Sequence, residues 1–336
     1  MTMRIERFPA GEGRMEDFAA VRSAVGYPTP DDEVPEGAVC LVGYDANRPV
    51  ARLALRVAPE LQGAPGPSGL VGWYETVDGG AGAALLVRAR ELLAESGVTR
   101  VLGPMNGSTW NRYRLALPPA PGEEPRTPFL TEPVNPPEYP LHWTAAGFSV
   151  AAEYESRLAR RPADERADAS APVQTRTGHG VTVAPLDPAR FDDALREIFE
   201  LSLAAFAGNL FYTPIGFDEF AAAYQKVRPL LDPELVRLAR GADGRLLAFV
   251  FAFPDPFDRA PDRHPRVVLK TLATAPEARG LGLGGRLTGE IHEAAFARGA
   301  PSVIHALMHV DNTSTRISGN YRGELFRRYA LYGWSP

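Results

Sequence analysis

The residues most suited to chemistry form a glycine-rich turn, RGLGLGG, at positions 279–285. An apolar run at 267–272 precedes the turn and predicts a strand, and apolar residues recur at helical spacing from Leu287 to Ala295 after it. The first N–H groups of such a helix have no internal partner, and the helix dipole adds partial positive charge there. Glycines let the backbone approach a phosphate without a side chain in the way. The turn therefore predicts a site for a phosphorylated ligand.

Two familiar nucleotide motifs fit the turn less well. Residues 280–285 satisfy the dinucleotide pattern G-x-G-x-x-G, but the next apolar run, 302–308, ends without the carboxylate that such sites place on the ribose. A nucleoside triphosphate loop closes with Lys and Ser or Thr, whereas Gly285 is followed by Arg and Leu. The best fit is the pattern Arg-x-x-Gly-x-Gly over residues 279–284.

Small residues at Ala273 and Thr274 end the predicted strand, and Pro276 lies just before the turn. With the helix and the strand that follow, this arrangement resembles the GNAT superfamily of acyl-CoA-dependent N-acyltransferases. In that family the turn wraps the pyrophosphate of coenzyme A, and the strand before it pairs with the pantetheine amides. The resemblance implies acetyl-CoA or another acyl-CoA as the donor and a small-molecule amine as the acceptor.

The resemblance also implies which residues contact the donor. Asn312 and Ser314 match the family's asparagine turn, although Asn-Thr-Ser is equally a plain helix N-cap. The expected contacts are Leu272, Ala273 and Thr274 for pantetheine, Arg279, Gly280, Leu281, Gly282, Leu283 and Gly284 for the pyrophosphate, and Asn312 and Ser314.

The order of predicted elements occurs twice along the chain. In both halves a strand, a Pro-rich loop, a strand, a glycine-rich turn, a helix and a further strand follow one another, which indicates two copies of one α/β unit. Residues 161–178 have the composition of a linker. We therefore expect a domain at 1–160, a linker at 161–178 and a second domain at 179–336.

The first copy lacks the arginine pattern, and Asp78 places a negative charge where a phosphate would bind. The segments GPMNGSTWNRYR in the first half and KTLATAP and HALMHVDNTST in the second resemble two-domain bacterial GNAT-like proteins with a degenerate N-terminal half. The resemblance implies tandem GNAT folds, each a central mixed, mostly antiparallel β-sheet flanked by helices, with the donor site in residues 179–336.

Acyl transfer needs a neutral amine on the thioester carbonyl and a proton for the leaving thiolate. The family's usual acid is a tyrosine about two turns after the asparagine; Gly319 stands near that place, and Tyr321 is the candidate two residues later. A buried structural tyrosine is the alternative interpretation.

The residue at the family's usual base position also differs in this chain. Many relatives carry a glutamate early in the strand before the turn, and Val268 occupies the matching position. Lys270 lies on the same strand face and can act as a base if burial lowers its pKa, or contact an anion. His305 and His309 are further candidates, and a regular strand places them on one face because they are four residues apart.

Aromatic and amide side chains gather in both halves where the acceptor pocket is expected. Since clefts between domains are favoured ligand sites, we expect the first copy to supply part of this pocket. The expected acceptor contacts are Asn106, Trp110, Asn209, Tyr212 and Asp255.

Composition limits the remaining possibilities. The chain has 336 residues and a net charge of −5, so no basic surface for nucleic acid or anionic lipid is expected. Cys40 is the single cysteine and the histidines lack ligand spacing, which argues against a metal site. There is no signal peptide and no apolar run of about 18 residues, so a cytoplasmic location is expected.

The sequence therefore predicts an acyltransferase that acylates a small-molecule amine, in bacterial specialised metabolism. Two alternatives stay open. The acyl group can come from the phosphopantetheine of an acyl carrier protein, which would use arginines such as Arg279 and Arg286. The chain can also be a non-catalytic regulator that binds acyl-CoA, because the usual acid and base positions are not occupied by Tyr and Glu.

Overall fold

The computed structural model describes residues 3–26, 32–63, 66–162 and 180–336. Most of the predicted linker lies outside these residues. In the described part of the chain, thirteen strands form one continuous mixed sheet in the order β1-β2-β3-β4-β5-β13-β7-β12-β11-β10-β9-β8, and β6 pairs with β13. The α/β fold class expected from the sequence is confirmed.

The N-terminal half contains seven strands and three helices within the described residues. The elements are β1 (Arg4–Pro9), α1 (Met15–Val25), β2 (Val39–Asp45), β3 (Arg48–Ala58), β4 (Ser68–Thr76), α2 (Gly79–Glu95), β5 (Arg100–Gly103), β6 (Leu115–Ala116), α3 (Tyr139–Ala145) and β7 (Ser149–Arg160).

The C-terminal half repeats this order. Its first helix is preceded by a 3₁₀ turn, because Pro188 supplies a fixed φ at the first position and Asp187 caps the turn. The elements are β8 (Thr182–Pro185), η1 (Pro188–Arg190), α4 (Phe191–Phe206), α5 (Phe217–Val227), η2 (Arg228–Leu230), η3 (Pro233–Leu235), β9 (Val236–Arg240), β10 (Leu246–Pro254), β11 (Val267–Thr274), η4 (Pro276–Ala278), α6 (Leu283–Ala297), β12 (Ser302–His309), α7 (Thr313–Gly319) and β13 (Glu324–Trp334).

The two halves share one strand arrangement. Strands β1 to β4 are antiparallel and β5 lies parallel to β4; strands β8 to β11 are antiparallel and β12 lies parallel to β11. The helix between each parallel pair, α2 or α6, makes the crossover that parallel strands require. The internal repeat read from the sequence is therefore present in the fold.

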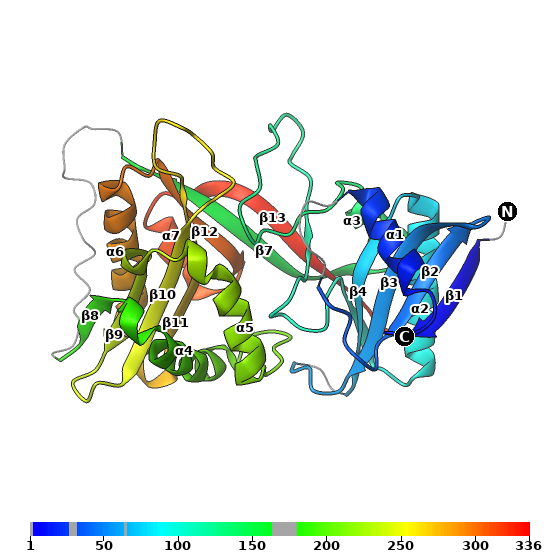
Figure 1. Cartoon of the computed structure of the whole chain (residues 1–336), viewed down its shortest axis with the longest axis horizontal. Helices are drawn as coiled ribbons and strands as arrows, with labels where there is room; N and C mark the ends of the chain where they lie inside the picture. The colour runs from blue at the N-terminus through cyan, green and yellow to red at the C-terminus, as the bar shows by residue number, and fades with distance from the viewer. Residues whose placement is uncertain (1–2, 27–31, 64–65, 163–179) are drawn as a thin grey trace.

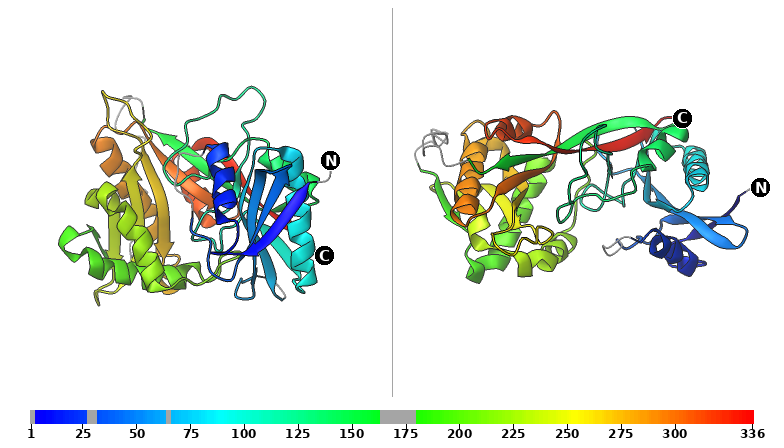
Figure 2. Two further views of the ribbon diagram at one scale, coloured as in Figure 1. Left: turned by 45° about the vertical axis from the view of Figure 1, so that its right-hand side comes forward. Right: turned by 90° about the horizontal axis from the view of Figure 1, so that it is seen from above.

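The last strands of the two halves are exchanged. Strand β7, from the N-terminal half, pairs with β12, and β13, from the C-terminal half, pairs with β5. The two exchanged strands also pair with each other from Glu324↔Leu158 to Gly333↔Ser149. They run side by side between the halves in Figures 1 and 2. Each half therefore includes a strand from the other half, so a boundary at one position of the sequence does not separate them completely. The division at 161–178 stays a prediction.

Three apolar regions hold this arrangement together. One surrounds α6 and β10 in the C-terminal half, and a second lies between α2 and the N-terminal sheet. A third joins the halves and includes Tyr154, Phe211 and Tyr329. The segment between β5 and α3 lies between the two halves in Figure 1. None of the helices within the described residues is long and apolar enough to cross a membrane.

Candidate active site between two splayed strands

Strands β11 and β12 separate part of the way along their length. They pair only from Val267↔Val303 to Leu269↔His305. Beyond these pairs, β11 carries a bulge, because Thr271 and Leu269 face consecutive residues of β10 and Lys270 is the extra residue. The separation leaves backbone groups of β11 available on the β12 side past Leu269. We call the space between the two strands beyond these pairs the wedge.

The glycine turn closes one end of the wedge. After β11 the chain passes through η4 and reaches α6, with Gly280 at φ +85° and Gly282 at φ +75°. These left-handed conformations favour glycine. Gly282 stands at the N-cap of α6 and no side chain caps this helix end. The first N–H groups of α6 are therefore available to an anion.

Side chains around the turn keep its inner surface small. A Cβ added at Gly284 would lie 3.2 Å from Ile317 Cδ1, so this position is close to α7. Arg279 points away from the helix end: its Nη2 donates to Ala205 O, 3.0 Å away, at the carboxyl end of α4. Leu281 is 38% exposed at the outside of the turn. An anion at this helix end would therefore meet backbone N–H groups rather than the Arg279 side chain.

The corresponding space in the N-terminal half is filled by its own residues. Strands β4 and β5 also pair over only three residues, Ser68 to Leu70 on β4. Past them, the amide of Met105 donates to Val71 O at 2.8 Å, and Trp73 N–H donates to Asn106 Oδ1 at 2.7 Å. The hydroxyl of Tyr139 accepts from Thr76 N at 2.9 Å. The strand edge that would bind pantetheine is therefore occupied.

The N-terminal helix end is closed as well. Helix α2 begins at Gly79, directly after Val77 and Asp78, so no glycine turn separates it from β4. Asp78 caps the helix, with Oδ1 accepting from Ala81 N at 2.8 Å. A Cβ on Gly79 would lie 2.7 Å from His142 Nε2. A carboxylate and an imidazole thus stand where a phosphate would need to bind.

Tyr321, the predicted acid, faces α6. Its hydroxyl donates to Gly285 O at 3.4 Å, and its ring stacks on His292 with centroids 4.0 Å apart. Burial raises the pKa of Tyr321 to about 12, with Glu293 adding to the shift. Gly319, at the family's usual position, has no atom within 4 Å of an added Cβ. These contacts favour a packing role for Tyr321.

The expectation that His305 and His309 share a face is wrong. His305 pairs with Arg157 and His309 pairs with Tyr154, residues on opposite faces of β7. Strand β12 uses one residue more than β7 between His305 and Met308, and such an irregularity reverses the faces that follow it.

The two histidines accordingly have different surroundings. His305 lies 2.8 Å from His292, measured between the Nε2 atoms, and burial lowers the pKa of His305 to about 4. His309 packs edge-on against Tyr154, with centroids 5.1 Å apart, and its Nδ1 accepts from Asp311 N at 3.2 Å. His305 is in the last pair between β11 and β12, whereas His309 lies beyond these pairs, at the end of β12.

Lys270 lies at the start of the wedge, as the bulged residue of β11. Its side chain is half-buried. Burial, with a smaller contribution from the nearby Arg114 guanidinium, lowers the pKa of Lys270 to about 8. Lys270 therefore lies at the wedge, where the sequence predicts either a base or a contact to an anion.

The predicted acceptor contacts divide into two groups. Trp110 and Tyr212 come together, with ring centroids 6.1 Å apart, and Trp110 Nε1 donates to Thr213 O at 2.9 Å. The hydroxyl of Tyr212 is buried without a hydrogen-bond partner among the described residues. Asn209 is exposed and its carbonyl accepts from Tyr212 N at 3.2 Å.

Asn106 and Asp255 are held in structural networks. Asn106 bonds Trp73, as above, and its Nδ2 donates to Asp32 Oδ2 at 2.6 Å. Asp255 is fully buried and accepts from Arg266 Nε at 2.8 Å and from Leu130 N at 3.1 Å. Both residues therefore support loops rather than face the wedge. Asn312 and Ser314 form the N-cap of α7, with Ser314 N donating to Asn312 Oδ1 at 3.4 Å.

Sequence reasoning missed Arg114. This residue comes from the N-terminal half, yet its Nη1 donates to Leu307 O on β12 at 3.3 Å. The rings of Tyr113 and Tyr154 lie on it, 3.8 and 4.0 Å from the guanidinium carbon. The alternation of Trp, Arg and Tyr in WNRYR is the signal that could have indicated a cation held by aromatic rings.

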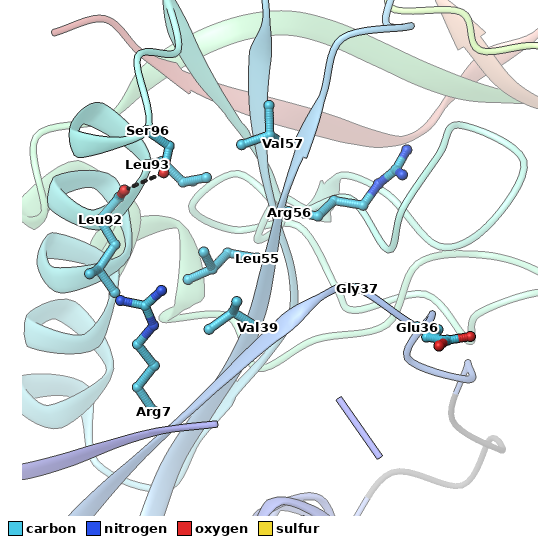
Figure 3. Close-up of a pocket in the computed structure, with 10 residues that line it drawn as sticks. All are labelled: Arg7, Glu36, Gly37, Val39, Leu55, Arg56, Val57, Leu92, Leu93 and Ser96. Atoms are coloured by element: carbon cyan, nitrogen blue, oxygen red, sulfur yellow. Dashed lines mark hydrogen bonds between the residues drawn. The ribbon is translucent and has the colours of Figure 1, made fainter. Parts of the chain in front are cut away.

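A second hollow lies in the N-terminal half, away from the wedge. It has a volume of about 390 Å³, and Val39 and Leu55 face Leu92 and Leu93 of α2 across it (Figure 3). Arg7 reaches over its edge from β1. None of the residues predicted from the sequence to act on a ligand lines it. Within the described residues there is no group of three or more side chains suited to a metal ion.

Comparisons with known proteins agree with the geometry of the wedge. Residues 195–317 match the model of the Acetyltransferase (GNAT) family. This match runs from within α4 to α7 and includes β11, the glycine turn and β12. A search of curated proteins returns no match.

Solved structures show the same fold over the whole chain. A GCN5-related N-acetyltransferase from Sphaerobacter thermophilus is 14% identical, with a TM-score of 0.52 and coverage of 98% of this chain and 95% of that one. A tandem GNAT protein from the clavulanic acid biosynthesis pathway is 17% identical, with a TM-score of 0.51 and coverage of 99% and 98%. A probable N-acyltransferase from Enterococcus faecalis V583 is 10% identical, with a TM-score of 0.59 and coverage of 100% and 72%.

The fold over the whole chain is that of GNAT structures, and residues 195–317, which include the wedge, match the Acetyltransferase (GNAT) family. More particularly, the two-copy arrangement is the fold seen in a tandem GNAT protein, and the family match falls in the C-terminal half.

Proposed function

We propose that the C-terminal half transfers an acyl group from acyl-CoA to the amine of a small molecule at the wedge. We further propose that the N-terminal half no longer binds coenzyme A. The observation that carries both statements is the contrast between the two splayed strand pairs. One leads to an uncapped helix N-terminus behind a glycine turn, and the other is filled by Met105, Asn106 and Tyr139.

The residues around the wedge suit coenzyme A. The backbone of Leu272 to Thr274 would hold pantetheine, and the first N–H groups of α6 would hold the pyrophosphate. When bound, acyl-CoA supplies the activated acyl group as a thioester. The chain's own residues then orient the amine against it and exclude water, and the amine attacks in its neutral form.

Two contacts favour coenzyme A over an acyl carrier protein as the donor. A carrier protein would bind through exposed arginines near the turn. Here Arg279 donates to Ala205 O, and Arg286 Nε donates to Glu290 Oε1 at 3.1 Å. Since both guanidinium groups have partners within their own half, an acidic carrier surface would have to compete with those partners. The pathway is a proposal drawn from the tandem GNAT resemblance: specialised bacterial metabolism.

The donor site can be tested by charge at Leu281. Leu281→Glu places a carboxylate at the turn without altering a glycine, and Leu281→Gln is the neutral control of nearly the same shape. A like charge a few ångströms from a pyrophosphate costs about 1–4 kcal/mol at the effective dielectric of a protein surface. We expect calorimetric titration to give acetyl-CoA affinity about tenfold weaker or worse for the Glu variant and little changed for the Gln variant.

The outcomes separate the proposed donor from its alternatives. Equal acetyl-CoA affinity in both variants would contradict placement of the pyrophosphate at this turn. If the wild-type protein does not bind acetyl-CoA but transfers the acyl group of a loaded carrier protein to the acceptor, the donor is carrier-bound. Tight acetyl-CoA binding without turnover of any amine would favour the non-catalytic regulator.

A further inference from the structure

Arg114 is a buried cation with an unused hydrogen-bonding edge. Its side chain belongs to a residue that is only 7% exposed. Nη1 donates to Leu307 O, but Nε is buried with no hydrogen-bond partner among the described residues. Tyr113 and Tyr154 cover the guanidinium, so the plane of the group is fixed by ring contacts. A guanidinium held in this way presents N–H groups in a fixed direction.

Lys270 is the second cation in this place. It is the first residue of β11 beyond the pairs with β12, while Leu307, which accepts from Arg114, lies beyond the same pairs on β12. The charge of Arg114 contributes to the lowered pKa of Lys270, which indicates that the two groups are close enough to repel. In the part of the chain that the structure describes, neither residue forms an ion pair.

Three other arginines with little exposed side chain differ from Arg114. Each of the three has a carboxylate at hydrogen-bonding distance, which offsets the cost of removing the charge from water. The pairs are Arg52 with Glu75, Arg266 with Asp255 and Arg327 with Glu132. Two neighbouring cations without a carboxylate are therefore an exception within this fold, and they lie at the wedge.

We propose that the acceptor amine carries a small oxyanion, a carboxylate or a phosphate, which binds between Arg114 and Lys270. The inference rests on the proposed acyltransferase function and names the class of its acceptor. Carboxylates and phosphates accept two parallel hydrogen bonds from a guanidinium edge, which matches the unused Nε side of Arg114. Arg114 belongs to the N-terminal half, so this half determines acceptor specificity although its own donor site is closed.

The same two cations assist the reaction. An amine attacks a thioester only when it is neutral, and a nearby positive charge lowers the pKa of an ammonium group. An acceptor anchored by its oxyanion brings its ammonium group close to Arg114 and Lys270. The anchor therefore binds the acceptor and favours loss of the ammonium proton to solvent before the neutral amine attacks.

Matched acceptors and variants test the anchor. Turnover is measured with acetyl-CoA and pairs that differ only in the anion: amino acids against their carboxamides, and phosphoethanolamine against ethanolamine. We expect kcat/KM to be at least tenfold higher for the anionic member, either in the amino acid pairs or in the phosphoethanolamine pair. The pair that shows the difference identifies the anion as a carboxylate or a phosphate. Arg114→Gln should raise the KM for that acceptor at least tenfold, leave the neutral member within about twofold and leave acetyl-CoA affinity unchanged.

Arg100→Gln is the matched control. Arg100 is also a partly buried arginine near the junction of the halves, 4.6 Å from the ring centroid of Phe211, but it lies outside the wedge. Its replacement should leave the preference for the anionic acceptor intact. Arg114→Lys keeps the positive charge but cannot donate two parallel hydrogen bonds, so it should retain only part of the preference for the anionic acceptor.

Thermal unfolding gives a readout that does not need turnover. At constant ionic strength, inorganic phosphate should raise the Tm of Leu281→Glu, whose pyrophosphate site is impaired, and not that of Leu281→Glu combined with Arg114→Gln. In phosphate-free buffer, Lys270→Met should raise Tm by about 2–4 °C, because it removes an unpaired charge from a half-buried position.

Three results would be decisive. Equal use of charged and neutral acceptors, or an anion preference that survives Arg114→Gln, overturns the anchor and leaves the acyltransferase function standing. Absence of acetyl-CoA binding and of all turnover overturns the proposed function, and the phosphate-dependent Tm then decides the anion site alone. A phosphate effect that persists without the Arg114 guanidinium also overturns the anchor.

Discussion

Lowering the pH from 7.5 to 5 should destabilise this protein through the buried pair His292 and His305. Their Nε2 atoms are 2.8 Å apart, so one ring donates to the lone pair of the other. Both pKa values are lowered from 6.5, that of His305 to about 4, by burial, and for His292 additionally by the charge of His305. Unfolding lets both rings bind protons near pH 6.5, so the unfolded state binds more protons below that pH and stability falls with the pH.

The magnitude follows from the lowered proton affinities. Each tenfold difference in proton affinity corresponds to about 1.4 kcal/mol, so His305 alone contributes a loss of about 2 kcal/mol at pH 5. His292 acts in the same direction, so the pair together should lose more than the roughly 2 kcal/mol that His305 contributes between pH 7.5 and pH 5. Carboxylates whose pKa is lowered, such as Asp17 and Asp258, lose their contribution only nearer pH 4.

Urea unfolding at several pH values measures this loss. The double variant with His292→Leu and His305→Leu replaces both partners by apolar groups, which can be nearly neutral at pH 7.5, and should lack most of the slope. His305→Leu alone leaves one buried ring without a partner and should cost about 1–3 kcal/mol at pH 7.5.

Parallel pH slopes in wild type and double variant would refute the argument. If the double variant does not fold, NMR titration of the wild type still decides. A His305 ring signal that titrates near pH 6.5 contradicts burial of the neutral pair, and would also restore His305 as a candidate base.

Two further predictions concern side chains whose roles the structure reassigns. Tyr321→Phe should change kcat by less than about twofold, because the hydroxyl faces Gly285 O; a loss of about a hundredfold or more, typical of a missing general acid, would contradict this. Glu132→Gln should lower the free energy of unfolding by about 3–5 kcal/mol in urea titrations, since it leaves Arg327 without its buried carboxylate. The control is Glu324→Gln, which disrupts the exposed pair between Arg160 and Glu324 and should cost less than about 1 kcal/mol. Equal effects of the two variants would refute the argument.

Local patterns predicted the elements of the donor site well. The apolar run at β11, the glycine turn and the periodic residues of α6 are adjacent in the sequence, and each reflects backbone preferences over a few residues. Two glycines of the turn adopt positive φ, which is why glycine was informative there. The repeat of element order was visible for the same reason, because each copy is built from neighbouring segments.

The side chains around the acceptor could not be placed in this way. Asn106 and Trp110 are close in sequence, but only Trp110 reaches the C-terminal half. His305 and His309 lie on opposite faces of β12 because β12 has one extra residue relative to β7 between them. Only pairing with β7, a strand distant in the sequence, defines this register. Arg114 was missed because its partners, Leu307 and Tyr154, are far from it in the chain.

The sequence by itself determined the two copies, the uncapped helix N-terminus behind a glycine turn, and the charge that closes the first copy, since these follow from short-range spacing and residue type. Only the tertiary structure decided that β7 and β13 change places, because both strands satisfy the same pattern and pairing is chosen by the whole sheet. That exchange joins the two halves along one sheet, and it is across this junction that Arg114 of one half reaches the wedge of the other.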